Sequence, residues 1–305
     1  MKIVFCLAAS FFCLQSLFAQ QDSAEKKVPV LELGVRYQSN SVYLGRKDSL
    51  PLPYVIPNIR FTSPSGFYAS AETYLLTSES RADAFSLDAG WEFSKGNLYG
   101  GIGASAYMFN SQSVNVLAEA STSINSYLGF SLPFIQPGIN GALIFGKGSL
   151  DYITGFSLEH NFTTANEAFS LTPGIYLNAG TQNYYNEYYQ ERKYNTGSGK
   201  GRGKKSSNSG NGSSSAPVIE NVETLQSSQF RVLDYEFAAP VEYKHKQLAF
   251  SFLPRYAIAQ SPSTVVMTTK AASGAVSTQT FTEKISNSFY WTLGVSYHFN
   301  LKKHA

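Results

Sequence analysis

Residues 289–299 read Phe-Tyr-Trp-Thr-Leu-Gly-Val-Ser-Tyr-His-Phe. In an extended strand, successive side chains point to opposite faces. One face of this stretch is therefore apolar throughout and consists of Phe289, Trp291, Leu293, Val295, Tyr297 and Phe299. The other face is smaller and more polar, and consists of Tyr290, Thr292, Gly294, Ser296 and His298. A strand with these two faces is typical of a wall between lipid and water.

The same alternation recurs along the chain, in segments separated by turn residues. Together they predict about 12 strands, within a range of 10–14, each near the length of a tilted membrane strand. The segments are 31–37, 54–61, 67–76, 85–93, 98–109, 115–131, 134–145, 150–160, 169–180, 230–243, 248–258 and 285–299. We therefore expect an all-β fold, an antiparallel up-and-down transmembrane β-barrel over residues 28–305. An even strand count places both termini on the periplasmic side.

Charged residues keep to the polar faces of these segments. A charge on the lipid face would cost about 2–4 kcal/mol at the middle of the bilayer, so this segregation is expected of a membrane barrel. A soluble β-sandwich would show the same alternation with its apolar faces turned inward. Aromatic residues towards the ends of the apolar faces, and many Gly, Ala and Ser on the polar faces, favour the barrel.

The N-terminal residues have the pattern of a secretory signal peptide. Lys2 precedes a mostly apolar run over residues 3–18, and Ala19 precedes two glutamines. We expect a signal peptide over residues 1–19 and a short periplasmic segment over 20–27, the apolar run being short for a membrane helix. Cys6 and Cys13 both lie in the signal, so the mature chain is expected to have no disulfide and no cysteine metal site.

Composition narrows the class of partner. The formal net charge is only +3, which is not the footprint of a nucleic-acid-binding protein. Charged residues make up 15% of the chain, against about a quarter in soluble domains. This deficit fits a protein whose outer surface meets lipid. No cofactor motif is present, so no cofactor is expected.

The signal peptide, the dozen amphipathic strands and the final strand ending in Tyr297-His298-Phe299 resemble bacterial outer-membrane β-barrel proteins, and more distantly uncharacterised barrels of the Bacteroidetes type. The resemblance implies a place in the bacterial outer membrane, in contact with its lipid and lipopolysaccharide. It also implies that the barrel-insertion machinery recognises the last strand. The chain departs from many members of this group in continuing for six residues, 300–305, after Phe299.

The alternation also predicts which charged residues face the lumen. Acids outnumber bases among them, so a water-filled lumen would prefer cations. Alternatively these groups pair with one another and fill a narrow barrel. The candidates are Glu32, Arg36, Arg60, Glu72, Asp88, Glu92, Glu159, Asp234, Glu236, Glu242 and Arg255.

The longest connection, at about 182–227, is predicted to be a disordered outer loop. Its residues 197–215 are mostly Gly, Ser and Asn, a composition that cannot form a packed core. Two groups in this loop are candidates for surface contact, with a glycan, lipopolysaccharide or a partner. Alternatively, the tyrosines extend an aromatic girdle or pack above the strands, and the basic residues lie in a solvated loop. The candidates are Tyr184, Tyr185, Tyr188, Tyr189, Lys200, Arg202, Lys204 and Lys205.

Catalysis has little support in the sequence. No metal-binding or nucleophile motif occurs, and His160 and His298 are interpreted as structural polar residues. We therefore expect a non-enzymatic outer-membrane protein, either a small-solute channel with cation preference or a surface structural protein. The alternatives are an exported soluble adhesin or carbohydrate-binding protein and an outer-membrane lipid hydrolase. The oligomeric state is left open.

Overall fold

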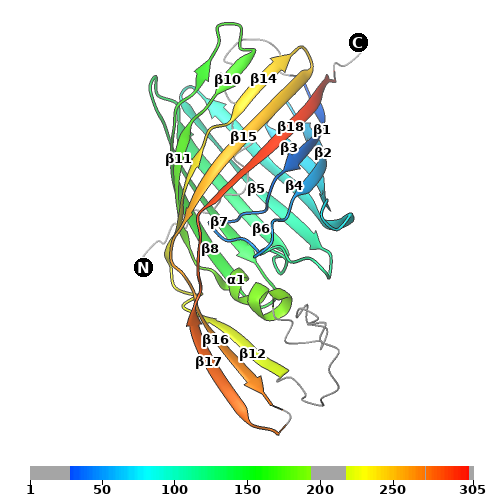
Figure 1. Cartoon of the computed structure of the whole chain (residues 1–305). Coiled ribbons are helices and arrows are strands. Elements are labelled where there is room, and N and C mark those ends of the chain that lie inside the picture. The colour runs from blue at the N-terminus through cyan, green and yellow to red at the C-terminus, as the bar shows by residue number, and fades with distance from the viewer. Residues whose placement is uncertain (1–27, 194–217, 272, 302–305) are drawn as a thin grey trace.

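The computed structural model describes residues 28–193, 218–271 and 273–301. Fifteen strands form one antiparallel sheet, which closes into a cylinder because β13 pairs with both β11 and β15 (Figure 1). Of these fifteen, β9, β10 and β14 continue neighbouring strands, which leaves twelve in the wall. The twelve are β1 (Val30–Gln38), β2 (Tyr54–Thr62), β3 (Phe67–Leu76), β4 (Arg81–Lys95), β5 (Leu98–Phe109), β6 (Thr122–Phe130), β7 (Gln136–Phe145), β8 (Leu150–Glu159), β11 (Gly174–Gly180), β13 (Arg231–Ala238), β15 (Leu248–Ala259) and β18 (Ser288–Asn300).

Three strands continue the wall strands at one end of the barrel, and two of them, β10 and β14, lie beyond a break at a proline. The three are β9 (Phe162–Thr163), β10 (Phe169–Leu171) and β14 (Val241–His245). Pro173 separates β10 from β11, and Pro240 separates β13 from β14. Proline has no N–H to give to a ladder, and here the carbonyl of Pro240 instead accepts the N–H of Thr172 at 2.9 Å. Beyond the prolines, β10 therefore pairs with β14, as β11 pairs with β13 before them.

The cylinder is completed by its first and last strands. β1 pairs antiparallel with β18, from Val30 opposite Asn300 to Gln38 opposite Thr292. The all-β, twelve-stranded barrel predicted from the alternation is thus confirmed. One predicted strand was too long, because β6 begins at Thr122 and residues 115–121 fold into the mouth of the barrel. There the Asn115 side chain accepts the N–H of Leu117 at 3.0 Å and bends the chain.

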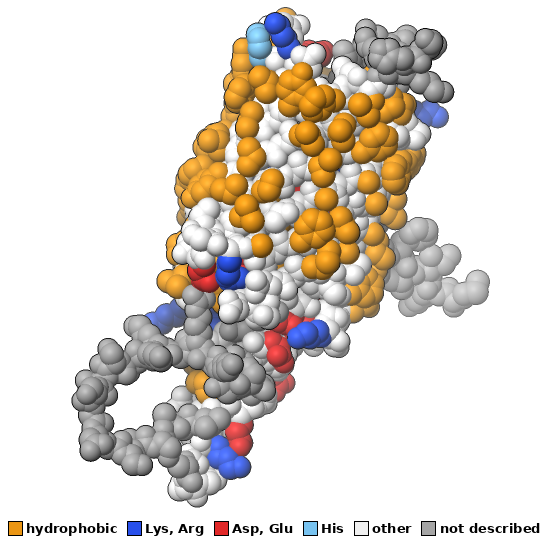
Figure 2. Space-filling view, turned by 90° about the vertical axis from the view of Figure 1, so that its right-hand side faces the viewer, with side chains coloured by type: hydrophobic (Ala, Val, Ile, Leu, Met, Phe, Trp, Pro, Cys, Tyr) orange, Lys and Arg blue, Asp and Glu red, His pale blue; other side chains and the backbone are white. Residues whose placement is uncertain are grey.

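The apolar faces point outward, as a membrane barrel requires and a sandwich does not. On β18, Phe289 is 64% exposed and Leu293 is 52% exposed, whereas Tyr290 and Thr292 between them are buried. Figure 2 shows hydrophobic side chains spread over the barrel wall and charged ones gathered towards its ends. The soluble alternative, in which these residues form a protein interior, is therefore wrong.

The two ends of the barrel differ. The end that holds Val30 and Asn300 has short turns over residues 63–66, 96–97, 131–135 and 246–247, besides one longer connection, 160–173, that contains β9 and β10, and we call it the short-turn end. The opposite end, the long-loop mouth, carries the connections 39–53, 110–121, 181–230 and 260–287, besides two short ones. Within the described residues, no helix has the length and apolar content needed to cross a membrane.

The longest connection is more ordered than its composition suggests. It contains α1 (Asn183–Tyr188), the π-helical turn η2 (Tyr189–Lys193) and β12 (Val218–Leu225). β12 joins β16 (Thr264–Lys270) and β17 (Val276–Thr282) in a three-stranded sheet that extends beyond the mouth (Figure 1). The prediction of disorder over 182–227 is therefore wrong at both ends of that range. Its middle, residues 194–217, lies outside the described residues.

Candidate lumen and mouth plug

The lumen wall carries ten of the eleven predicted charged residues on its inward faces, and the eleventh, Glu242, lies on the extension β14. On each strand these residues alternate with exposed apolar ones, as Arg36 does with Val35 and Leu33. The eleven candidates comprise eight acids and three arginines, an excess of five acids. The structure thus places these residues where the alternation predicted, while their role in passage of a solute stays a prediction.

Each of the three arginines is paired with a carboxylate across the strands. Arg36 Nη2 lies 2.7 Å from Glu72 Oε1, and Arg60 Nη2 lies 3.0 Å from Glu92 Oε2. Arg255 Nη1 lies 3.3 Å from Glu236 Oε1. Glu32, Asp88, Glu159, Asp234 and Glu242 are left over, so these pairs do not neutralise the lumen.

Most of the remaining acids are held by neutral donors. The Tyr176 hydroxyl donates to Glu159 at 2.6 Å, and Asn178 Nδ2 donates to Asp234 Oδ1 at 2.8 Å. Glu242 pairs with Lys244 at 3.3 Å on the extension β14. Hydrogen bonds from neutral groups orient a carboxylate without cancelling its charge, so the lumen keeps a negative excess.

A cavity of about 120 Å³ lies in the lumen just beneath the mouth. Its walls include Arg36, Glu72, Asp234 and Arg255, and its roof includes Tyr43. Asp234 is only 1% exposed, and its Oδ2 has no hydrogen-bond partner among the described residues. A buried carboxylate with a free oxygen is costly unless a cation or a proton reaches it. Of the five acids left over by the arginine pairs, Asp234 is the one that lines this cavity.

A second charged cluster lies in the lumen nearer the short-turn end. The Arg60 guanidinium sits 4.0 Å from the ring centroid of Tyr68 and pairs with Glu92. These contacts join the inward faces of the neighbouring strands β2, β3 and β4.

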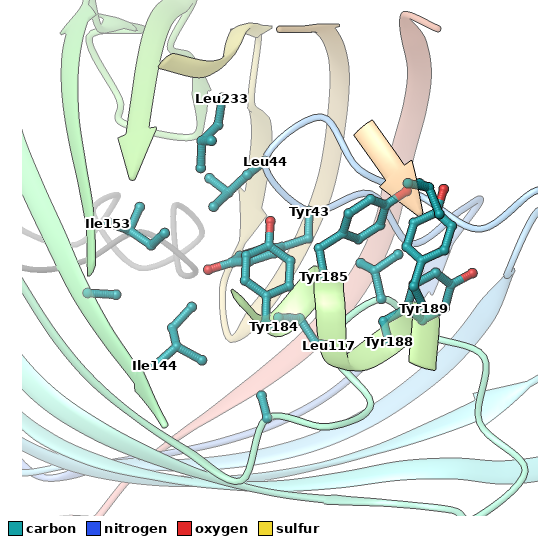
Figure 3. Packing of buried hydrophobic residues seen from close by; sticks show 14 of the residues in the cluster. Tyr43, Leu44, Leu117, Ile144, Ile153, Tyr184, Tyr185, Tyr188, Tyr189 and Leu233 are labelled. Carbon is teal, nitrogen blue, oxygen red and sulfur yellow. The ribbon is translucent and has the colours of Figure 1, made fainter. Parts of the chain in front are cut away.

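The mouth is closed by a cluster that we call the mouth plug (Figure 3). It is formed by Tyr43 and Leu44 from the loop 39–53, residues 116–120 from the loop 110–121, and the tyrosines of α1 and η2. These pack against wall residues such as Ile144, Ile153 and Leu233. The rings of Tyr43 and Tyr184 meet edge to face, with their centroids 5.2 Å apart.

The structure corrects the position predicted for the tyrosines. Tyr184, Tyr185, Tyr188 and Tyr189 are each at most 1% exposed and lie within the mouth plug, not on an exposed rim. Their clustering on one helical turn and its continuation lets four rings bury one another. The four basic candidates, Lys200, Arg202, Lys204 and Lys205, lie outside the described residues.

The wall anchors α1 through one carboxylate. Asp151 on β8 accepts the N–H of Asn183 and the N–H of Tyr184, both at 2.7 Å, and the hydroxyl of Thr181 at 2.6 Å. The first N–H groups of a helix have no partner within the helix, so a carboxylate there satisfies and attracts them. Gln182, the residue that precedes the helix, supplies no such bond.

A buried ion pair joins the loops of the plug to one another. Arg46, 2% exposed, places Nη1 at 2.9 Å from Glu283 Oε2 and donates through Nη2 to Gln182 Oε1 at 3.2 Å. The hydroxyl of Tyr185 donates to Glu283, and that of Tyr188 donates to Asp48. Three separate connections, 39–53, 181–230 and 260–287, are thereby tied together. We call the Arg46–Glu283 pair the latch.

Two of the plug tyrosines, Tyr185 and Tyr188, stay neutral over a wide pH range because their pKa values are raised. Burial first, and the adjacent carboxylate of Glu283 second, raise the pKa of Tyr185 well above its usual value. Burial and Asp48 do the same to the pKa of Tyr188. Both hydroxyls therefore remain hydrogen-bond donors to their carboxylates at physiological pH.

Sequence reasoning missed Arg46, Glu283 and Asp151. Asp151 lies on the polar face of a predicted strand, so the alternation could have added it to the lumen set. The latch residues are 237 positions apart in irregular connections, where no periodicity brings them together. His298, interpreted from the sequence as a structural polar residue, lies on the inward face of β18 with its Nε2 at 3.0 Å from Ser296 Oγ.

No family model matches the chain, and no curated protein matches it. Among solved structures it is similar to the KdgM porin, with a TM-score of 0.42 and 10% identity over 88% of this chain and 99% of that one. It is also similar to the CymD monoaromatic hydrocarbon channel, with a TM-score of 0.37 and 9% identity over 92% and 90%. LpxR from Salmonella typhimurium gives a TM-score of 0.36 and 10% identity over 88% and 100%.

These similarities are too low to carry an argument about function, and the class of the protein rests on its own geometry. A closed antiparallel wall, an apolar outer belt and a polar lumen define a β-barrel of the outer-membrane, porin-like type. Within that class, the chain is a twelve-stranded barrel whose mouth is closed by its own loops.

Proposed function

We propose that the chain is an outer-membrane channel for small cationic solutes, closed in this conformation by the mouth plug. The observation that carries the proposal is the buried carboxylate of Asp234 in the cavity directly beneath the plug, whose Oδ2 has no hydrogen-bond partner among the described residues. A lumen lined with excess acid attracts cations and repels anions. The barrel itself is expected to perform no catalysis.

The way the barrel is closed supports a channel over a filled structural barrel. The plug comes from connections at one end, and loops can move without breaking the wall. On the inward face of β5, Gly101, Gly103 and Ser105 lie between Tyr99 and Tyr107, and the rings of Tyr127 and Tyr68 occupy the space over the two glycines. These rings and the charge pairs fill much of the lumen at this level, which favours small solutes.

The proposal includes a place and an orientation in the cell. The barrel sits in the outer membrane of a Gram-negative bacterium, with both termini in the periplasm and the long-loop mouth outside. Its partners are the outer-membrane lipid and lipopolysaccharide around the apolar belt. The barrel-insertion machinery, which would recognise β18, acts during assembly.

Reversal potentials in planar bilayers test the selectivity. Under a salt gradient, wild-type protein should give small conductances with cation preference. Asp234→Asn should lower that preference because it removes the carboxylate from the cavity. Glu223→Gln is the matched control, since Glu223 is exposed on β12 outside the lumen and its loss should change nothing. Anion preference in the wild type, or equal effects of both variants, would contradict the proposal.

A lipid hydrolase is the second candidate, on one specific observation. Ser296 Oγ lies 3.0 Å from His298 Nε2, and Glu32 stands opposite His298 in the pairing of β1 with β18. A serine beside a histidine, with a carboxylate near the histidine, is the minimum for a hydrolytic nucleophile. Release of fatty acid from labelled phospholipid by the wild type, abolished in Ser296→Ala, would establish it. No release by the wild type removes it.

A further inference from the structure

The three-stranded sheet beyond the mouth has two edges that differ in how they are protected. Its order is β12-β16-β17, so β12 and β17 are the edge strands. All seven residues of β17 are exposed, among them Val276 at 60% and Phe281 at 36%. An exposed edge presents unpaired backbone groups to any strand that can reach it.

The β12 edge is blunted in several ways. A register shift between Ile219 and Asn221 interrupts it, and Glu220 and Glu223 add negative charge. The side chain of Asn186 on α1 accepts the N–H of Thr224 at 2.7 Å. Bulges, charges and covering segments are the devices by which proteins protect sheet edges.

Among the residues that the structure describes, the β17 edge has none of these devices. Its sequence, Val-Ser-Thr-Gln-Thr-Phe-Thr, has no charge and no proline, and its pairing with β16 has no register shift. Four of its seven residues are β-branched, a composition that favours strand pairing. The β12 edge is thus protected against pairing with a further strand, whereas the β17 edge is open to it. This difference within one small sheet indicates that the β17 edge pairs with another strand.

The pairing with β16 determines which backbone groups of β17 are free. The backbone N–H of Ala271 donates to the carbonyl of Ala275 at 2.9 Å. The backbone N–H of Glu283 likewise donates to the carbonyl of Ser263 at 2.8 Å. In an antiparallel ladder, alternate residues direct both backbone groups to the same neighbour. The odd-numbered residues of β17 therefore face β16. The even-numbered ones, Val276, Thr278, Thr280 and Thr282, present four N–H and four C=O groups to the open edge.

This set of groups is complementary to itself. In an antiparallel second copy, Val276 would stand opposite Thr282 and Thr278 opposite Thr280, so that all eight groups of each copy are paired. The two-fold axis passes beside Gln279, and no charged residue of one β17 meets one of the other. A shift by two residues in either direction leaves free groups at the ends.

We propose that β17 is a self-association edge, through which two copies of this chain form one continuous six-stranded sheet. The two-fold axis that relates antiparallel strands in a sheet is perpendicular to that sheet. Figure 1 shows the sheet extending away from the barrel at the long-loop mouth, seen nearly face on. The axis therefore points the two barrels in opposite directions, so that copies in two facing membranes, and not in one membrane, pair in this way.

Cysteine cross-linking tests the pairing register. The sequence has no cysteine besides Cys6 and Cys13 in the expected signal peptide. Gln279→Cys places two thiols across the axis, where opposed Cβ atoms are about 4.5–5.5 Å apart, and should give a disulfide-linked dimer under mild oxidation. Val276→Cys places its thiols six residues apart along the ladder, about 20 Å, and should give none. Equal cross-linking of both variants, or of neither, overturns the proposal.

Clustering of vesicles tests the edge itself and the facing arrangement. Proteoliposomes of wild-type barrel should cluster, as measured by light scattering. Thr278→Pro/Thr280→Pro should abolish clustering because it removes two outward N–H groups while sparing the bonds to β16. Thr278→Val/Thr280→Val keeps every N–H and should cluster like the wild type. Faster migration of unboiled than boiled protein on SDS gels confirms that each barrel is folded. No clustering of the wild type, or clustering of the proline variant, overturns the proposal.

Discussion

Replacing Arg46 with methionine should open the barrel. Methionine keeps the length and apolar stem of the arginine but removes the guanidinium from the latch. Glu283 then lacks its cation while its carboxylate, with 12% of its side chain exposed, stays within the plug. The wall strands lose nothing, because every partner of the guanidinium lies in a connection between strands.

The size of the effect follows from the burial of the pair. Removing one partner of a buried ion pair costs about 3–5 kcal/mol, because the remaining charge is left uncompensated. The lower end applies here, since the hydroxyl of Tyr185 still donates to Glu283. A change of about 3 kcal/mol in favour of the open state corresponds to a change of about a hundredfold in the ratio of open to closed barrels.

Single-channel recording in planar bilayers measures that ratio as the open probability. Arg46→Met should raise it strongly, while Lys270→Met, which breaks an exposed pair with Glu220, should leave it unchanged. The open probability of Arg46→Met/Glu283→Gln should lie between those of the wild type and Arg46→Met, because the double variant no longer buries an unpaired carboxylate. A folded Arg46→Met barrel that stays as closed as the wild type would refute the role of the latch.

Two further outcomes follow from the same geometry. Leu293→Arg, on the outward face of β18, should lower the free energy of unfolding in lipid by about 2–4 kcal/mol, measured by urea titration, whereas Leu225→Arg on β12 outside the barrel should have little effect. Because the closed state raises the pKa of Tyr185 and Tyr188, these hydroxyls stabilise closure below the ordinary tyrosine pKa of about 10. That stability is lost as the pH rises further. Conductance should therefore be constant from about pH 7 to 9 and increase above about pH 10. The variant Tyr185→Phe/Tyr188→Phe should not show this increase. An increase of the wild-type conductance already at neutral pH would contradict the role of the two hydroxyls in closure.

The wall could be predicted from the sequence because lipid imposes a period of two on every strand. A charge on the outer face is so costly that the pattern of Leu293 and its neighbours has few alternatives. The start of β6 could not be predicted, because residues 115–121 are alternating enough to pass for a strand. Only their packing against Tyr43 and the other plug residues removes them from the wall.

The plug and the outer sheet are harder to predict for different reasons. The tyrosines of α1 follow a turn and precede a Gly- and Ser-rich stretch, so composition indicated an exposed loop. Their burial depends on Asp151 and on loops far away in sequence. The β16–β17 hairpin, in contrast, had a readable signal, since two runs rich in β-branched residues flank Gly274, which adopts a positive φ of 85°.

Closure of the cylinder through β1 and β18 has a consequence for biosynthesis. β1, which is synthesised first, stays unpaired on one side until β18, which is synthesised last, has been made. A nascent or truncated chain therefore has two unpaired sheet edges and an exposed apolar face. Such an intermediate is prone to stick to its neighbours. We therefore expect the incomplete chain to depend on a chaperone until β18 has been made and has paired with β1.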